Sequence, residues 1–149
     1  MKIFFFAILL PLSAHASWLY NENGGFGIYR PEGWTASIDG RSSQLRGPES
    51  DSDQSEIFLG SDWVSGVRTL SDLRKFAVKD SGTSKLFPYS NSGLLGYRAG
   101  DSEHGALYVL RIPENVIEVK FQLRGSRAQI DEGETMVSSL EIRTKGIEQ

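Results

Sequence analysis

The sequence predicts an α+β domain in which a central antiparallel β-sheet is flanked by helices, in the manner of an α/β/α sandwich. Three observations support this fold class. Short segments of alternating apolar and polar residues recur along the chain, turn-forming residues separate them, and two segments with helical periodicity interrupt them. Runs of strands with inserted helices are typical of α+β architecture.

The first 16 residues have the parts of a secretory signal peptide. Lys2 gives a positive start, residues 3–12 form an apolar run, and Ala14-His15-Ala16 places small residues where a signal peptidase cleaves. The run is too short to span a bilayer, which takes roughly 20 apolar residues. We therefore expect cleavage after Ala16, no stable membrane anchor, and export to the periplasm or the medium.

Residues 17–149 are predicted to form a single domain. The chain contains no cysteine, which excludes disulfides and thiol chemistry, so packing must supply the stability. Its formal net charge is −3 and its basic residues are scattered. This distribution argues against nucleic acid as a partner.

The strand signal is clearest at Val116 to Arg124, where apolar and polar residues alternate. Just before it, Ala106 to Ile112 is a more apolar strand, and Pro113-Glu114-Asn115 provides the turn of a hairpin. Glycine, proline, serine or aspartate bounds each of the other predicted strands. These strands cover residues 26–30, 35–38, 43–46, 56–59 and 95–99.

Two helices are predicted among the strands. The first is capped by Thr69, carries Asp72 near the positive end of the helix dipole, and ends before Gly82. Its apolar stripe consists of Leu70, Leu73, Phe76 and Ala77. The second begins with Ser126 and Gln129 at capping-box spacing. Its apolar side consists of Ile130, Met136, Val137 and Leu140.

The stretch from Gly25 to Trp34 combines a strand, a Pro-x-Gly turn and a tryptophan at the edge of the core. In this context it resembles the N-terminal signature of the PsbP/Mog1-like superfamily. The strand end at residues 45–48, the helix at Thr69 and the late strand leading into the last helix fit the same resemblance, which covers most of residues 18–142.

This resemblance implies an antiparallel sheet with helices on both sides. It also implies a role in binding other proteins, as extrinsic subunits, assembly factors or partners of a small GTPase. The superfamily has no shared catalytic motif, so no functional residue is carried over. The role of this chain therefore has to be argued from its own residues.

Residues suited to catalysis are few. A serine nucleophile needs a base, and His104, in the polar turn between Gly100 and Gly105, is the one histidine left after signal removal. We expect this histidine to be solvated. A hydrolase would instead need two carboxylates facing each other, and the sequence selects no pair among Glu32, Asp39, Asp62 and Glu118. A small carboxylate-dependent hydrolase stays open as an alternative.

The acidic stretch from Glu49 to Glu56 is the candidate for a metal site. Asp51 and Asp53 have the spacing that opens a calcium loop. Glu56 then stands where the sharp turn requires glycine, and no downstream glutamate completes the loop. We expect a solvated acidic loop and no cofactor, with a calcium-dependent or carbohydrate-binding module as a further alternative.

Aromatic residues are the remaining candidates for a binding site. Trp34 and Trp63 are predicted to lie in the core. Others lie beside the processed N-terminus or in a turn-rich stretch, where they form a predicted exposed patch: Trp18, Tyr20, Phe87 and Tyr89. Because tryptophan and tyrosine dominate protein interfaces, the sequence predicts an exported, non-enzymatic domain that binds another protein, with a small ligand as the second choice.

Overall fold

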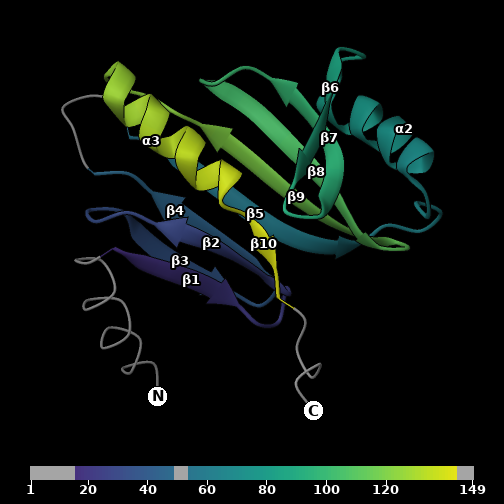
Figure 1. Ribbon diagram of the computed structural model, residues 1–149, viewed down its shortest axis with the longest axis horizontal. Helices are drawn as coiled ribbons and strands as arrows, with labels where there is room; N and C mark the ends of the chain where they lie inside the picture. Colours follow the sequence, from purple (N-terminus) through teal and green to yellow (C-terminus); the bar gives the residue numbers. More distant parts are fainter. Residues whose placement is uncertain (1–15, 49–53, 144–149) are drawn as a thin grey trace.

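The computed structural model describes residues 16–48 and 54–143, and the predicted signal peptide lies outside this range except for Ala16. The fold is α+β and forms a single domain, with a seven-stranded antiparallel sheet, a three-stranded sheet and two helices (Figure 1). The predicted fold class is confirmed at this level.

The large sheet has the strand order β3-β4-β5-β9-β8-β7-β6, and each neighbouring pair is antiparallel. Its strands are β3 (Thr35–Asp39), β4 (Ser42–Arg46), β5 (Glu56–Trp63), β6 (Leu86–Asn91), β7 (Leu94–Gly100), β8 (His104–Ile112) and β9 (Asn115–Gln122). The small sheet consists of β1 (Ser17–Asn21), β2 (Phe26–Arg30) and β10 (Glu141–Ile142). In this sheet β2 lies between the other two strands.

Both helices begin with the caps that the sequence predicts. In α2 (Leu70–Ser81), Thr69 Oγ1 accepts a hydrogen bond from the Asp72 N–H at 3.1 Å. In α3 (Arg127–Ser138), Ser126 Oγ accepts one from the Gln129 N–H at 3.2 Å. Capping boxes depend only on residues three apart, which is why sequence spacing identifies them.

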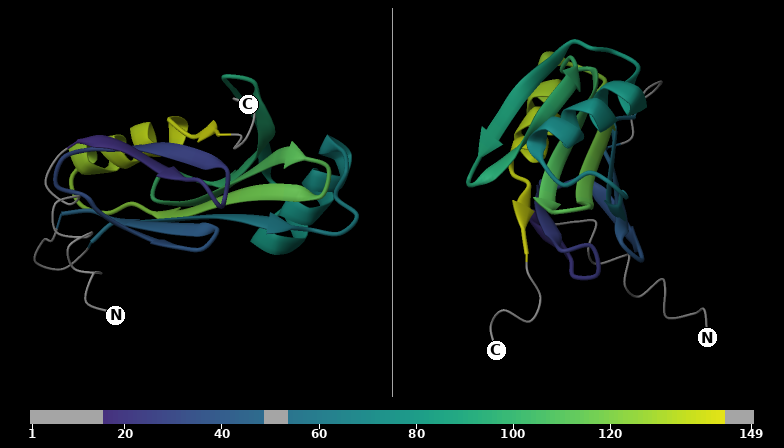
Figure 2. Two further views of the ribbon diagram at one scale, coloured as in Figure 1. Left: turned by 90° about the horizontal axis from the view of Figure 1, so that it is seen from below. Right: turned by 90° about the vertical axis from the view of Figure 1, so that its right-hand side faces the viewer.

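The two faces of the large sheet are covered unequally. On one face, Leu59, Leu107 and Val119 pack in a cluster with α3 and the small sheet, and we call this the core face. On the other, which we call the open face, Tyr108 and Ala106 of β8 pack against α2. Figure 2 shows α3 and the small sheet on one side of the large sheet, with α2 at one end of the other.

The structure corrects three sequence predictions. Neither β1 nor β6 was expected; β6 contains Pro88, which is tolerated because β6 is an edge strand. The strand predicted to end at Leu59 continues to Trp63. Trp63 is 62 % exposed at its end, so its assignment to the core was wrong. Trp34, at 1 % exposure, is in the core as predicted.

Candidate functional site

A groove of about 500 Å³ lies on the open face, beside the C-terminal end of α2. Its walls come from β4, β5, β8 and β9, from the end of α2, and from the β7–β8 turn. The groove exists because α2, a helix of about 18 Å, packs on β7 and β8 and leaves the β3–β4–β5 half of this face without a covering helix.

Phe58 lines the groove. Strand pairing aligns Gln44, Phe58, Lys120 and Ala106 in one row across β4, β5, β9 and β8. Phe58 is 47 % exposed, although its neighbours along this face of β5 are Glu56, Gly60 and Asp62, so it is an apolar ring on a polar surface. Ala106 gives the groove depth because its side chain is small.

The next row across the same strands is polar throughout. It contains Arg46, Glu56, Gln122 and His104. Arg46 Nε lies 3.7 Å from Glu56 Oε2, so this carboxylate forms an ion pair within the row. The row therefore supplies an amide on the strand next to Phe58 and an imidazole two strands away, without a large net charge.

Asp80, at the α2 side of the groove, contacts a hydroxyl group and an ammonium group. The Tyr108 hydroxyl donates to Asp80 Oδ2 at 2.7 Å, and Lys120 Nζ lies 3.0 Å from the same oxygen. Lys120 Nζ also lies 3.6 Å from Glu118 Oε1. We call Tyr108, Asp80, Lys120 and Glu118 the Asp80 network. It ties α2 to β8 and β9 and fixes the positions of the polar groups on this wall.

The pKa values of this network follow from its geometry. Burial alone would raise the pKa of Asp80, but the hydrogen bonds from Tyr108 and Lys120 outweigh it and lower that pKa. Burial, with the nearby Asp80 charge, raises the pKa of Glu118, whose side chain is only 14 % exposed. Burial and the bond to Asp80 also raise the pKa of Tyr108. The network thus lowers the pKa of Asp80 and raises that of its neighbour Glu118.

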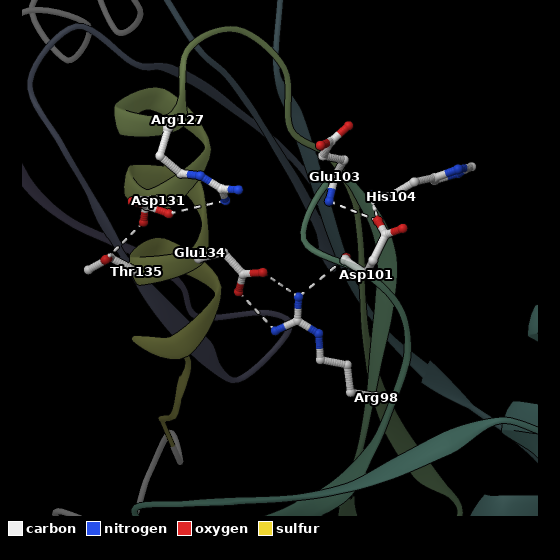
Figure 3. Close-up of polar contacts among 8 residues, drawn as sticks. All are labelled: Arg98, Asp101, Glu103, His104, Arg127, Asp131, Glu134 and Thr135. Atoms are coloured by element: carbon white, nitrogen blue, oxygen red, sulfur yellow. Dashed lines mark hydrogen bonds and ion pairs between the residues drawn. The ribbon is translucent and has the colours of Figure 1, made fainter.

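His104 follows the β7–β8 turn and lies at the edge of the groove. The turn is held in place by contacts on the core face, where α3 lies (Figure 3). Arg98 of β7 donates from two guanidinium nitrogens to Glu134 of α3, at 2.9 and 2.6 Å. Asp101 Oδ1 accepts from the backbone N–H groups of Glu103 and His104, each at 2.9 Å. Figure 3 shows the His104 ring directed away from α3. These hydrogen bonds therefore fix the β7–β8 turn at the edge of the groove.

The predicted aromatic patch is divided between the two sheets (Figures 1 and 2). Trp18 and Tyr20 are exposed on β1, with their rings stacked at 6.1 Å and Arg143 3.9 Å over the Tyr20 ring. Phe87 and Tyr89 lie on β6, at the edge of the large sheet, and Tyr89 is only partly exposed because it packs against the core. The structure gives two separate aromatic sites and neither lies in the groove. Their role in binding stays a prediction.

The other predicted candidates have mixed outcomes. Asp51 and Asp53 lie outside the described residues, and Glu56 forms the ion pair with Arg46. Among residues 16–48 and 54–143 no group of three or more metal-ligating side chains occurs. Within the same ranges neither helix is long and apolar enough to cross a membrane.

Sequence analysis did not identify Phe58 or Asp80. Of the carboxylates considered as hydrolase candidates, Glu118 belongs to the Asp80 network and Asp62 lies near it on the same face. The Phe58 row could not be found from spacing, because it depends on the pairing of β5 with β9 across about sixty residues. One local signal exists: Phe58 is an apolar residue at a position of β5 whose neighbours along that face are polar or glycine.

Comparisons with known proteins define the fold and no more. No protein-family model matches the chain, and no curated protein matches it. The chain is similar to a protein from Bacteroides thetaiotaomicron VPI-5482 whose crystal structure was determined at 1.50 Å resolution. The TM-score is 0.50 at 14 % sequence identity, covering 90 % of this chain and 50 % of that one. This chain therefore spans half the length of a bacterial protein with a similar fold.

Proposed function

We propose that the protein is an exported, non-enzymatic binding domain whose ligand occupies the groove on the open face. One observation carries the proposal: a concave space of about 500 Å³ holds an exposed phenyl ring beside a fixed polar network. Binding sites for small ligands are commonly 300–1,000 Å³ in volume and combine apolar surface with a few well-placed polar groups.

Binding fits the polar groups of the groove better than catalysis does. Asp80 already receives hydrogen bonds from Tyr108 and Lys120, which suits a fixed anchor for a ligand. His104 contacts Asp101 through its backbone N–H, while its ring is exposed. A general base needs its ring nitrogen, not its backbone, held beside the group it deprotonates.

Export is supported by where the first strand begins. β1 starts at Ser17, directly after the predicted cleavage site, and Ser17 Oγ accepts a hydrogen bond from Arg30 at 3.0 Å. Cleavage after Ala16 would leave every described strand and helix intact. Membership of the PsbP/Mog1-like superfamily stays a prediction; it is supported by an antiparallel sheet with one helix on each face.

A carboxylate-dependent hydrolase is the second candidate, and one observation favours it. Asp80 and Glu118 lie beside the same ammonium group, with the pKa of the first lowered and that of the second raised. Carboxyl pairs whose pKa values are pushed apart can divide the roles of base and acid. Glu118 does not line the groove, however, which places this candidate second.

The test is a mixed ligand screen of sugars, short peptides, amino acids and nucleotides, read by amide NMR shifts and by analysis of the recovered ligand. We expect shifts in β4, β5 and β9 for at least one compound, an increase in melting temperature, and unchanged ligand. No shift in these strands from any compound class would contradict the groove as a binding site. Turnover that is abolished by Asp80→Asn and kept by Asp39→Asn would favour the hydrolase instead.

A further inference from the structure

The charges of the groove are paired within the protein. Arg46 lies 3.7 Å from Glu56, and Lys120 lies 3.0 Å from Asp80 and 3.6 Å from Glu118. A charged ligand would have to compete with one of these pairs and would also lose its own hydration. The groove therefore favours a ligand without net charge.

Phe58 gives this ligand an apolar surface on which to stack. On its side of β5 the next residue is Gly60, and a Cβ added there would lie 3.7 Å from the Phe58 ring. The ring therefore leans over a position with no side chain, which lets it lie along the strand and leaves it 47 % exposed. A flat apolar face of a ligand can cover such a ring without burying a polar group.

The polar groups around the ring suit hydroxyls. Gln44 carries an amide that can both donate and accept, Gln122 can donate from its amide nitrogen while its Oε1 accepts from Arg124 at 2.6 Å, and the carboxylates of Glu56 and Asp80 accept. A hydroxyl group also both donates and accepts, so it can pair with any of them. A molecule with one apolar ring face and a rim of hydroxyls meets all of these conditions.

From these features we infer that the groove binds a neutral sugar, with one pyranose ring stacked on Phe58 and its hydroxyls bonded to Gln44, Gln122 and the Asp80 side of the groove. This inference rests on the proposed binding function and names the class of its ligand. The aromatic residues of β1 and β6 have no part in it.

The experiment titrates the protein with maltohexaose, cellohexaose, xylohexaose and chitohexaose, and follows amide NMR shifts and calorimetric heat. Oligogalacturonate and an uncharged glycine-serine peptide form two further arms. We compare the wild type with Phe58→Ala and with Phe87→Ala, a control at a second exposed phenylalanine (59 %, against 47 % for Phe58) on β6. We expect at least one neutral oligosaccharide to shift the amides of β4, β5 and β9.

The Phe58→Ala variant should bind this sugar at least about tenfold more weakly, whereas Phe87→Ala should bind it as the wild type does. Equal binding by wild type and Phe58→Ala overturns the inference, as does a preference for oligogalacturonate. If only the peptide shifts the groove amides, the sugar inference fails and the proposed binding site stands. If no compound shifts them, both fail.

Discussion

Replacing Tyr108 by phenylalanine removes one oxygen atom from the Asp80 network and leaves the rest of the side chain in place. The ring of Tyr108 is fully buried and makes an edge contact with Phe76, at 5.9 Å between centroids, which the variant can keep. The change therefore isolates the hydrogen bond from the hydroxyl to Asp80 Oδ2, which is 2.7 Å long.

Hydrogen bonds to charged groups contribute about 1.5–3 kcal/mol to stability. Asp80 keeps Lys120 at 3.0 Å in the variant, and its side chain is 29 % exposed, so the carboxylate is not left without a partner. We therefore expect the lower half of that range, a loss of about 2 kcal/mol in the free energy of unfolding. For a domain of this size the loss corresponds to a decrease of roughly 6–10 °C in melting temperature.

The loss should depend on pH with a defined sign. Because the pKa of Asp80 in the folded state is lowered, its charge stabilises the fold above the ordinary value of 3.8. That contribution is lost as the pH falls through the lowered pKa, and the benefit of the Tyr108 hydroxyl decreases with it. Urea unfolding at pH 7 and near pH 2.5 should therefore give a clearly smaller difference between the variant and the wild type in acid.

A double-mutant cycle with Asp80→Asn provides the control. If Tyr108 acts through Asp80, the two changes are coupled by at least about 1 kcal/mol at pH 7. Additive effects, or a loss of the same size at both pH values, would refute the assignment of the hydroxyl to Asp80. The stability of Tyr108→Phe would then reflect packing alone.

Three further predictions concern stability. Glu118→Gln should raise the melting temperature at pH 7, because the folded state disfavours the charge of Glu118. This gain should shrink as the pH falls through the raised pKa of Glu118 and vanish below its ordinary pKa of 4.5. A gain that does not depend on pH would contradict the prediction. In urea unfolding, Trp34→Ala should lower the free energy of unfolding by about 3–5 kcal/mol, because Trp34 is buried. Trp63→Ala should change it by no more than about 0.5 kcal/mol, because Trp63 is exposed. Losses of similar size in the two variants would be inconsistent with the exposure of Trp63. Gly133→Ala should lower the free energy of unfolding by about 1 kcal/mol in the same assay. The added Cβ would lie 2.5 Å from Leu123 Cδ2, and the cost of overpacking the core should exceed the gain in helix propensity. A more stable variant would disprove this.

Local features of the fold could be predicted from the sequence, and features that depend on long-range pairing could not. The caps at Thr69 and Ser126 involve residues three apart, and both are present. The sequence predicts that β5 ends at Leu59, because Gly60, Ser61 and Asp62 have the composition of a turn. In the structure β9 pairs with these residues and holds them as strand, which no local pattern records.

The candidate site was inaccessible to sequence analysis for the same reason. Asp80 lies at the end of α2, Tyr108 on β8 and Lys120 on β9, and they meet only because α2 packs across β8. The predicted export signal, in contrast, is a contiguous pattern, and its prediction does not need the fold. The sequence thus identified short-range features, while the groove required the register of four strands.

The exposure of Phe58 is what connects the fold to the proposed ligand. A phenylalanine that is 47 % exposed on a polar sheet face contributes less to stability than a buried one. Its loss should therefore lower sugar binding far more than it lowers the melting temperature. Changes at Gly133 and Trp34 should have the opposite effect, since both residues lie in the core and away from the groove. If Phe58 forms part of a ligand site, its replacement should reduce binding while the fold keeps its stability, and replacement of the core residues should do the reverse.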